Sequence, residues 1–243
     1  MLLNQQSDAM SFLGWLQQKY PGDTEILFLA VHVFSDLSER NAQELMKSAP
    51  ESPLVVQLNA EAFEKRGEIA KAIAEYRILT ARAPDRQGVH YRIGGLLMAQ
   101  QTEEAATQAK KEFEAELLLN PRNASAEFYL GELSSQNRAG DEAVAHYRRA
   151  VALYPSFGEA FAGLGRALLD SGKTADAIEP LERAASLAPG DPAIHLALGT
   201  AYQRSGRKAD AAREFALQKT AAAAINENVK TLRKTVSGVP PAR

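Results

Sequence analysis

Apolar residues recur along most of the chain at the three- and four-residue spacing typical of amphipathic helices. In residues 158–189, one helical face is marked by Phe161, Leu164, Gly165 and Leu168. The polar segment 170–174 then interrupts this face, and Gly172 suits the left-handed backbone of a turn. A second helix is marked by Ala177, Leu181 and Ala184. Pro189 ends the unit, because the residue before a proline avoids the helical region. The pattern therefore predicts a pair of helices.

The same two-helix pattern repeats at a nearly constant interval. Prolines lie at Pro50, Pro84, Pro121, Pro155 and Pro189, with spacings of 34, 37, 34 and 34 residues. Small residues with the same spacings are Ala60, Gly94, Gly131, Gly165 and Gly199. A second small series is Ala72, Ala109, Ala143, Ala177 and Ala211, and four residues after each come Tyr76, Phe113, Tyr147, Leu181 and Phe215. Because these series share one period, we infer a stack of helical repeats, with three extra residues near positions 100–103.

Two units carry the fullest set of repeated residues. One contains Leu198, Gly199, Tyr202, Gly206, Ala211 and Phe215, and the other contains Leu130, Gly131, Ala143, Tyr147, Ala150 and Pro155. They resemble the tetratricopeptide repeat family, whose pattern is W-x2-L-G-x2-Y, then A-x3-F, then P. None of the units has the tryptophan, and Ala223 replaces the last proline. The resemblance covers residues 53–225 and implies an all-α, right-handed α-α superhelical solenoid of helix-turn-helix repeats.

The repeat pattern divides the chain into five full units and two flanking parts. The expected repeats are 53–86, 87–123, 124–157, 158–191 and 192–225. Residues 1–52 are expected to form degenerate or partial repeats, with a helix pair in 24–49 that is shortened in its second helix. Because the pattern begins on a half-repeat, we leave open that the chain is a fragment of a longer protein.

The C-terminal residues predict one long helix. Between Gly206 and Gly238 there is neither glycine nor proline, so the last helix should continue to about residue 235. We assign 226–236 to a capping extension and 237–243 to a tail. One apolar stripe contains Phe215, Ala222, Ile225, Val229, Leu232 and Val236. Its part beyond Ile225 needs a partner, either an earlier helix of the same chain, which we favour, or the same helix of a second molecule.

Composition excludes several classes of function. Hydrophobic residues make up 45% of the 243 residues, the formal net charge is -2, and there is no cysteine. This balance gives no general attraction to nucleic acid, and it allows no disulfide or thiolate chemistry. The most hydrophobic run, 26–34, contains His32 and is shorter than the ~20 residues that a membrane-spanning helix needs. Residues 1–18 contain no Lys or Arg, so we expect no signal peptide in this chain, and the sequence leaves its compartment undetermined.

Motifs that could carry catalysis have simpler explanations. Residues 167–174 match a relaxed phosphate-binding loop that ends in Gly172, Lys173 and Thr174, but the repeat places them in a helix and a turn. The four histidines lack the spacing of a zinc site, and no Ser-His-Asp signature is present. We therefore expect no cofactor, no metal and no enzymatic activity.

The first helix of each repeat offers a candidate binding surface. In this family the first helices line the concave side, so the resemblance implies a groove there. The candidate peptide-binding residues are Tyr91, Arg92, Met98, Phe128, Tyr129, Glu132, Arg166 and Arg204. Aromatic, Met and Arg side chains are enriched at binding hot spots. For Tyr91 and Phe128, packing between neighbouring first helices is an equal alternative.

These residues favour a scaffold that binds a protein or peptide. The three arginines suggest an acidic segment or a C-terminal carboxylate as the ligand, because guanidinium groups hold carboxylates in bidentate geometry. Two other functions stay open. The chain could be the tetratricopeptide region of a larger enzyme or assembly factor, or a structural module that forms a homodimer through residues 225–236.

Overall fold

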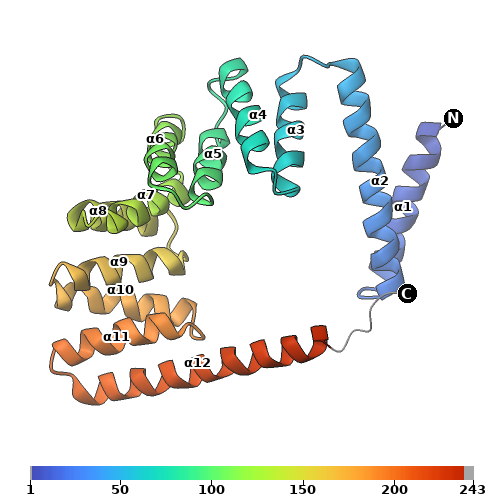
Figure 1. The fold of residues 1–243 in the computed structure, drawn as a ribbon. Coiled ribbons are helices and arrows are strands. Elements are labelled where there is room, and N and C mark those ends of the chain that lie inside the picture. Colours follow the sequence, from blue (N-terminus) through green and yellow to red (C-terminus); the bar gives the residue numbers. More distant parts are fainter. Residues whose placement is uncertain (1, 238–243) are drawn as a thin grey trace. The chain divides into compact units, whose positions relative to one another are not determined.

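A computed structural model describes residues 2–237 as a purely helical chain (Figure 1). The helices are α1 (Leu2–Lys19), α2 (Thr24–Ser48), α3 (Pro53–Lys65), α4 (Ile69–Arg82), α5 (Val89–Met98), α6 (Glu103–Leu119), α7 (Ala124–Gln136), α8 (Gly140–Leu153), α9 (Gly158–Asp170), α10 (Thr174–Leu187), α11 (Pro192–Arg204) and α12 (Lys208–Ser237). No strand occurs in this range. The predicted all-α solenoid of helix pairs is confirmed. No helix among the described residues combines the length and the apolarity that crossing a membrane requires.

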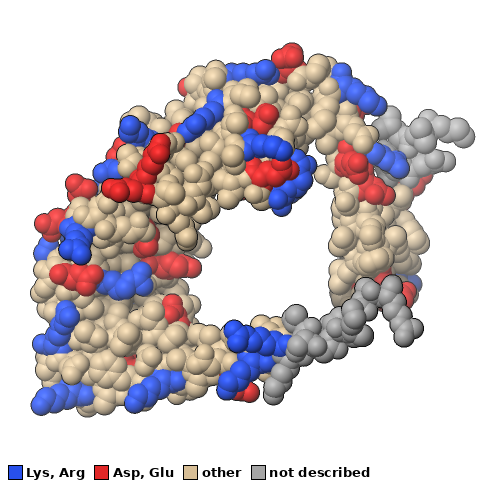
Figure 2. Space-filling view, in the orientation of Figure 1, with Lys and Arg blue, Asp and Glu red and all other residues tan. Residues whose placement is uncertain are grey.

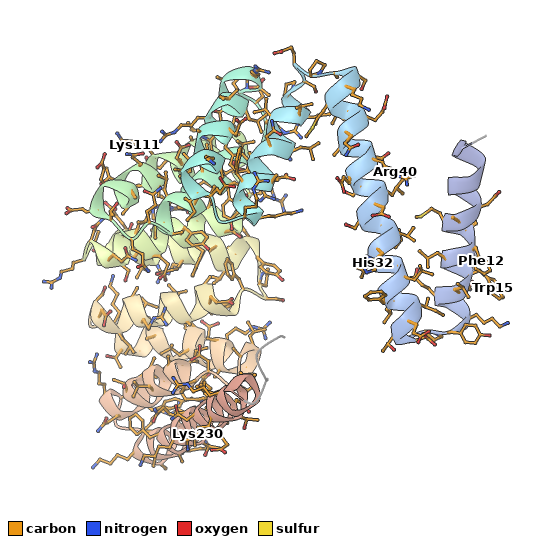
Figure 3. The ribbon with its side chains drawn as sticks, turned by 45° about the vertical axis from the view of Figure 1, so that its right-hand side comes forward. Phe12, Trp15, His32, Arg40, Lys111 and Lys230 are labelled. Carbon is orange, nitrogen blue, oxygen red and sulfur yellow. The ribbon has the colours of Figure 1, made fainter. Side chains whose placement is uncertain are left out.

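The chain forms two compact units, residues 1–84 and residues 85–243. The first unit contains the hairpin of α1 and α2, followed by the pair α3 and α4. In this hairpin Leu13 and Ala30 are buried. Figure 3 shows Phe12 and Trp15 on the side of α1 that is turned away from α2. The hairpin therefore has a small core and carries large apolar side chains on its surface.

The sequence predicted a helix pair in residues 24–49, and this prediction is wrong. Helix α2 is one continuous helix of 25 residues. Its start is fixed by Asp23, whose Oδ1 accepts hydrogen bonds from the backbone N–H groups of Glu25 (3.0 Å) and Ile26 (3.1 Å). No glycine or proline lies between residues 24 and 48, so nothing in the sequence forces a turn.

The second unit stacks four helix pairs, α5/α6, α7/α8, α9/α10 and α11/α12. The turns within the last three pairs have three residues each, and Gly172 and Gly206 adopt positive φ angles of 74° and 78° in two of them. Helix α6 has 17 residues where α8 and α10 have 14. The three extra residues of this repeat therefore lengthen a helix and do not form a long loop.

A buried carboxylate ties the start of α5 to its neighbours. Glu116 of α6 is fully buried, and its two oxygens accept hydrogen bonds from the backbone N–H of Gly88 at 2.9 and 2.8 Å. Asn123 Nδ2 donates to Glu116 Oε1 at 3.3 Å, and Asn123 caps α7 through the N–H of Ala126. Gly88 has no side chain with which to cap α5, so Glu116 performs that role and also fixes the start of α7.

The last helix continues past its repeat as the sequence predicted, because α12 runs unbroken from Lys208 to Ser237. Its first half packs on α11. Ile225, Val229 and Leu232 are 47%, 41% and 64% exposed, so no described helix of the second unit provides the expected intramolecular cover. The predicted tail is 237–243, and its residues after Ser237 lie outside the described residues. The side chains from residue 234 onward lie outside them too.

Candidate functional site

A hollow of about 470 Å³ lies on the first helices of the second unit. It is lined by Phe128, Glu132, Ser156, Gly158, Glu159, Ala162, Arg166, Leu187, Ala188, Asp191 and Ile194. Gly158, Ala162 and Ile194 are buried, whereas Glu159 and Arg166 are exposed. Ala162 and Ile194 belong to a packed core cluster with Ala184 beneath the hollow, and half-buried Phe128, Leu187 and Ala188 add apolar surface beside the charged rim.

The rim carries more negative than positive charge. Its carboxylates belong to Glu132, Glu159 and Asp191, and its one guanidinium belongs to Arg166. Glu132 accepts a short hydrogen bond from the hydroxyl of Tyr147, and Glu132 Oε1 lies 3.9 Å from Arg166 Nη2. Arg166 is therefore already near a carboxylate.

The other two rim carboxylates lie at the starts of helices. Asp191 is the N-cap of α11, where its Oδ1 accepts a hydrogen bond of 2.8 Å from the N–H of Ala193. Glu159 lies in the first turn of α9, where the helix dipole stabilises negative charge. Both carboxylates thus lie where backbone N–H groups of a helix start complement negative charge.

The aromatic residues predicted for the groove form one packed cluster. The ring centroids of Tyr91 and Tyr129 are 6.1 Å apart, and Tyr129 stacks on Phe113 at 5.2 Å with an interplanar angle of 5°. Phe128 contacts Tyr147 at 6.0 Å. Burial raises the pKa of Tyr129, and the neighbouring Tyr91 and Glu132 raise it further. Tyr91, Phe128 and Tyr129 thus each pack against another aromatic ring, and Phe128 also lines the hollow.

The remaining predicted residues lie in different places. Arg92 is exposed on α5, whereas Arg204 Nη1 donates a hydrogen bond of 3.2 Å to the carbonyl of Leu169. Met98 lines a separate hollow of about 510 Å³, together with Gln136 and Asn137. Of the predicted set, the hollow on the first helices thus brings together Phe128, Glu132 and Arg166.

Sequence reasoning missed the residues that close the hollow from the side. Ser156, Leu187, Ala188 and Asp191 lie in or beside the turns that join one repeat to the next. Turn residues have no helical periodicity, so the pattern could not place them. Asp191 carried one usable signal, because an Asp directly before a Pro is typical of the start of a helix.

The phosphate-loop match has an ordinary structural role. Ala167 is inside α9, residues 171–173 form the turn, and Thr174 begins α10. Lys173 Nζ donates a hydrogen bond of 2.9 Å to Asp141 Oδ1 of the neighbouring repeat. No strand precedes this turn in the described range, so the backbone cradle that such a loop requires is missing.

Three histidines pair with glutamates and not with each other. The Nδ1-to-Oε2 distances are 2.6 Å for His90 and Glu112, 2.7 Å for His146 and Glu127, and 2.8 Å for His195 and Glu214. Among the described residues, no group of three or more His, Cys, Asp or Glu side chains could hold a metal ion. These pairs join first and second helices of the same repeat.

The fold, a stack of helix pairs with a hollow on its first helices, defines a helical-repeat protein. Two family models, each described as tetratricopeptide repeat, match the chain, one over residues 58–109 and 106–156 and the other over residues 168–234. The chain belongs to the tetratricopeptide repeat family. None of the curated proteins matches its sequence.

Several solved structures share this fold. YrrB, described as a TPR protein with an unusual peptide-binding site, is 18% identical, and its crystal structure gives a TM-score of 0.63 over 74% of this chain and 91% of YrrB. A crystal structure of MamA is 19% identical, with a TM-score of 0.63 over 80% and 100% of the two chains. MamA from Desulfovibrio magneticus RS-1 is 19% identical, with a TM-score of 0.64 over 72% and 97%. At these identities the similarity concerns the fold.

Proposed function

We propose that this protein is a non-catalytic scaffold that binds a peptide segment of a partner protein in the hollow on α7, α9 and α11. The observation that carries the proposal is the combination of an apolar lining, at Phe128, Leu187 and Ala188, with a charged rim. An apolar anchor can enter such a hollow while the flanking polar residues of the peptide stay at the rim. The unusual peptide-binding site described for YrrB supports the same role on this fold.

The rim charges select the chemistry of the peptide. With three carboxylates and one guanidinium, the rim attracts a segment that carries Lys or Arg next to its apolar anchor. An acidic segment or a C-terminal carboxylate, which the sequence suggested, would have to compete with Glu132 for Arg166 and would meet Glu159 and Asp191. We therefore propose a basic-apolar peptide as the ligand, with the acidic ligand as the competing outcome.

Selection from a random-peptide display library tests both the site and the ligand class. The immobilised wild-type protein should enrich peptides that contain an aliphatic or aromatic residue flanked by Lys or Arg. A Glu159→Lys variant reverses one exposed rim charge and should lose these peptides. The matched control is Glu179→Lys, which changes an exposed residue of α10 outside the hollow and should retain them.

Two results would count against this proposal. Enrichment of acidic peptides would establish the ligand class that the sequence suggested. Retention of the same peptides by the Glu159→Lys variant would show that the hollow is not the site.

A further inference from the structure

Two helices of this chain are much longer than the repeat helix that each one packs against, and α2 packs on the 18-residue α1 as well. Helix α2 has 25 residues beside the 13 of α3, and α12 has 30 residues beside the 13 of α11. At a rise of about 1.5 Å per residue, α2 extends roughly 18 Å and α12 roughly 25 Å beyond the length of its neighbour. Each long helix thus has an overhanging half that the repeat stack does not need.

The overhang of α2 carries an apolar stripe without cover. Leu27, Val31 and Phe34 follow one another at helical spacing and are 47%, 66% and 47% exposed. The same stripe continues to Ala42 and Leu45 in the C-terminal half of α2. Both of these residues are half-buried. Because α1 covers a different side of α2, it leaves the first part of this stripe in solvent. Figure 3 shows His32, a neighbour of this stripe, on the side of α2 that is turned away from α1.

The overhang of α12 repeats this arrangement. Ala211 is buried and Phe215 and Ala222 are half-buried, whereas Ile225, Val229 and Leu232 on the same stripe are exposed. Apart from Gln218, which interrupts it, the stripe keeps the alternating spacing of four and three residues from Ala211 to Leu232, which is the spacing of a helix-helix seam. The apolar positions therefore continue past the point where their partner helix ends.

The two overhangs have opposite charge. Residues 24–36, the overhanging half of α2, contain two acidic residues, Glu25 and Asp36, and no basic residue. Residues 217–237 contain four basic residues and one acidic residue. Figure 2 shows Lys and Arg side chains gathered on the C-terminal part of α12. Pairing α12 with α12, or α2 with α2, would bring like charges together, whereas pairing α12 with α2 brings opposite charges together.

We propose that the C-terminal half of α12 in one molecule packs along the Leu27–Val31–Phe34 stripe of α2 in a second copy of this chain. The contact joins two different surfaces, so each molecule has one of each and copies add head to tail. This interface differs from a symmetric dimer through residues 225–236, because the partner surface is α2. It also leaves the hollow on α7, α9 and α11 out of the contact.

Sedimentation velocity of two variants and their mixture tests the proposal. Val31→Glu removes the α2 surface and Leu232→Glu removes the α12 surface, and both side chains are more than 60% exposed, so the fold should persist by circular dichroism. The wild type should gain mass as its concentration rises, and each variant alone should stay monomeric. An equal mixture should form a heterodimer and nothing larger, because each variant supplies the surface that the other lacks.

A matched control and two outcomes complete the test. Leu118→Glu changes an aliphatic side chain of α6 that is 84% exposed, and it should associate like the wild type. Wild-type protein that is monomeric at all concentrations would overturn the proposal. Association that persists in Val31→Glu but is lost in Leu232→Glu would also overturn it, because that result requires α12 to pair with itself.

Discussion

Gly94 and Phe113 approach each other so closely that no side chain fits between them. A Cβ atom on Gly94 would lie 2.6 Å from Phe113 Cε1, and the Phe113 ring is fully buried and stacked on Tyr129. The adjacent Gly95 has nothing within 4 Å of the same position. Packing against Phe113 therefore requires a glycine at position 94 of α5, but it does not require one at position 95.

Substitution of these two glycines by alanine should have opposite effects on stability. Gly94→Ala should lower the free energy of unfolding by about 1–3 kcal/mol, because the buried ring cannot move away. Gly95→Ala should raise it by roughly 0.5–1 kcal/mol, because alanine is the better helix former. Chemical denaturation of both variants measures this difference. Equal effects at the two positions would contradict the close packing of α5 on α6.

His195 is held by two acceptors in the core of the last repeat. Its Nδ1 lies 2.8 Å from Glu214 Oε2 and its Nε2 lies 2.9 Å from the carbonyl oxygen of Pro189. Burial alone would lower the pKa of His195, but the Pro189 carbonyl and Glu214 together raise it above its ordinary value of 6.5. The charged imidazolium can donate to both acceptors at once, whereas the neutral ring can donate to one.

The stability of the protein should therefore depend on pH through His195. The free energy that charged His195 contributes to folding is present in full below pH 6.5. It is lost as pH rises through the raised pKa of His195. Denaturation at several pH values should show that the cost of His195→Gln is largest in acid and shrinks toward alkaline pH. His32→Gln, at an exposed position, is the control and should have little effect. A cost of His195→Gln that does not change with pH would contradict the paired arrangement.

ATP should not bind at the loop that contains Lys173. The turn lies between two helices, and Lys173 already donates to Asp141. Isothermal titration with Mg-ATP should give no saturable heat, in the wild type or in Lys173→Ala. Saturable binding that is lost in Lys173→Ala would show that the turn is a nucleotide site.

The regular part of the fold was predictable because packing requires the same residue types at each repeat. Gly131 and Gly165 permit the close approach of Tyr147 and Leu181, so their spacing reveals the helix pairs. Helix α2 was not predictable in this way, because its residues do not follow the repeat. Its N-cap Asp23 and its lack of breakers were the available signals for one long helix.

The candidate site was predictable in part. Phe128, Glu132 and Arg166 follow from the helical face of the repeat, and they line the hollow. Arg204 shares that face, but its guanidinium reaches the Leu169 carbonyl, a contact between repeats that no single-helix pattern contains. Asp191 lies in an inter-repeat turn, where position depends on how two repeats stack. Residues fixed by one helix could thus be inferred, and residues fixed by stacking could not.

The location of a bound peptide tests the central claim most directly. A peptide selected on the wild-type protein, with its apolar anchor replaced by a photoreactive phenylalanine analogue, should cross-link to α9 and to the turn before α11. Mass spectrometry of the digested product should place the adducts within residues 156–166 and 187–194, and Glu159→Lys should reduce their yield. Adducts confined to α8 and α10 outside these ranges, unchanged in Glu159→Lys, would contradict the proposal that this protein binds peptides in the hollow.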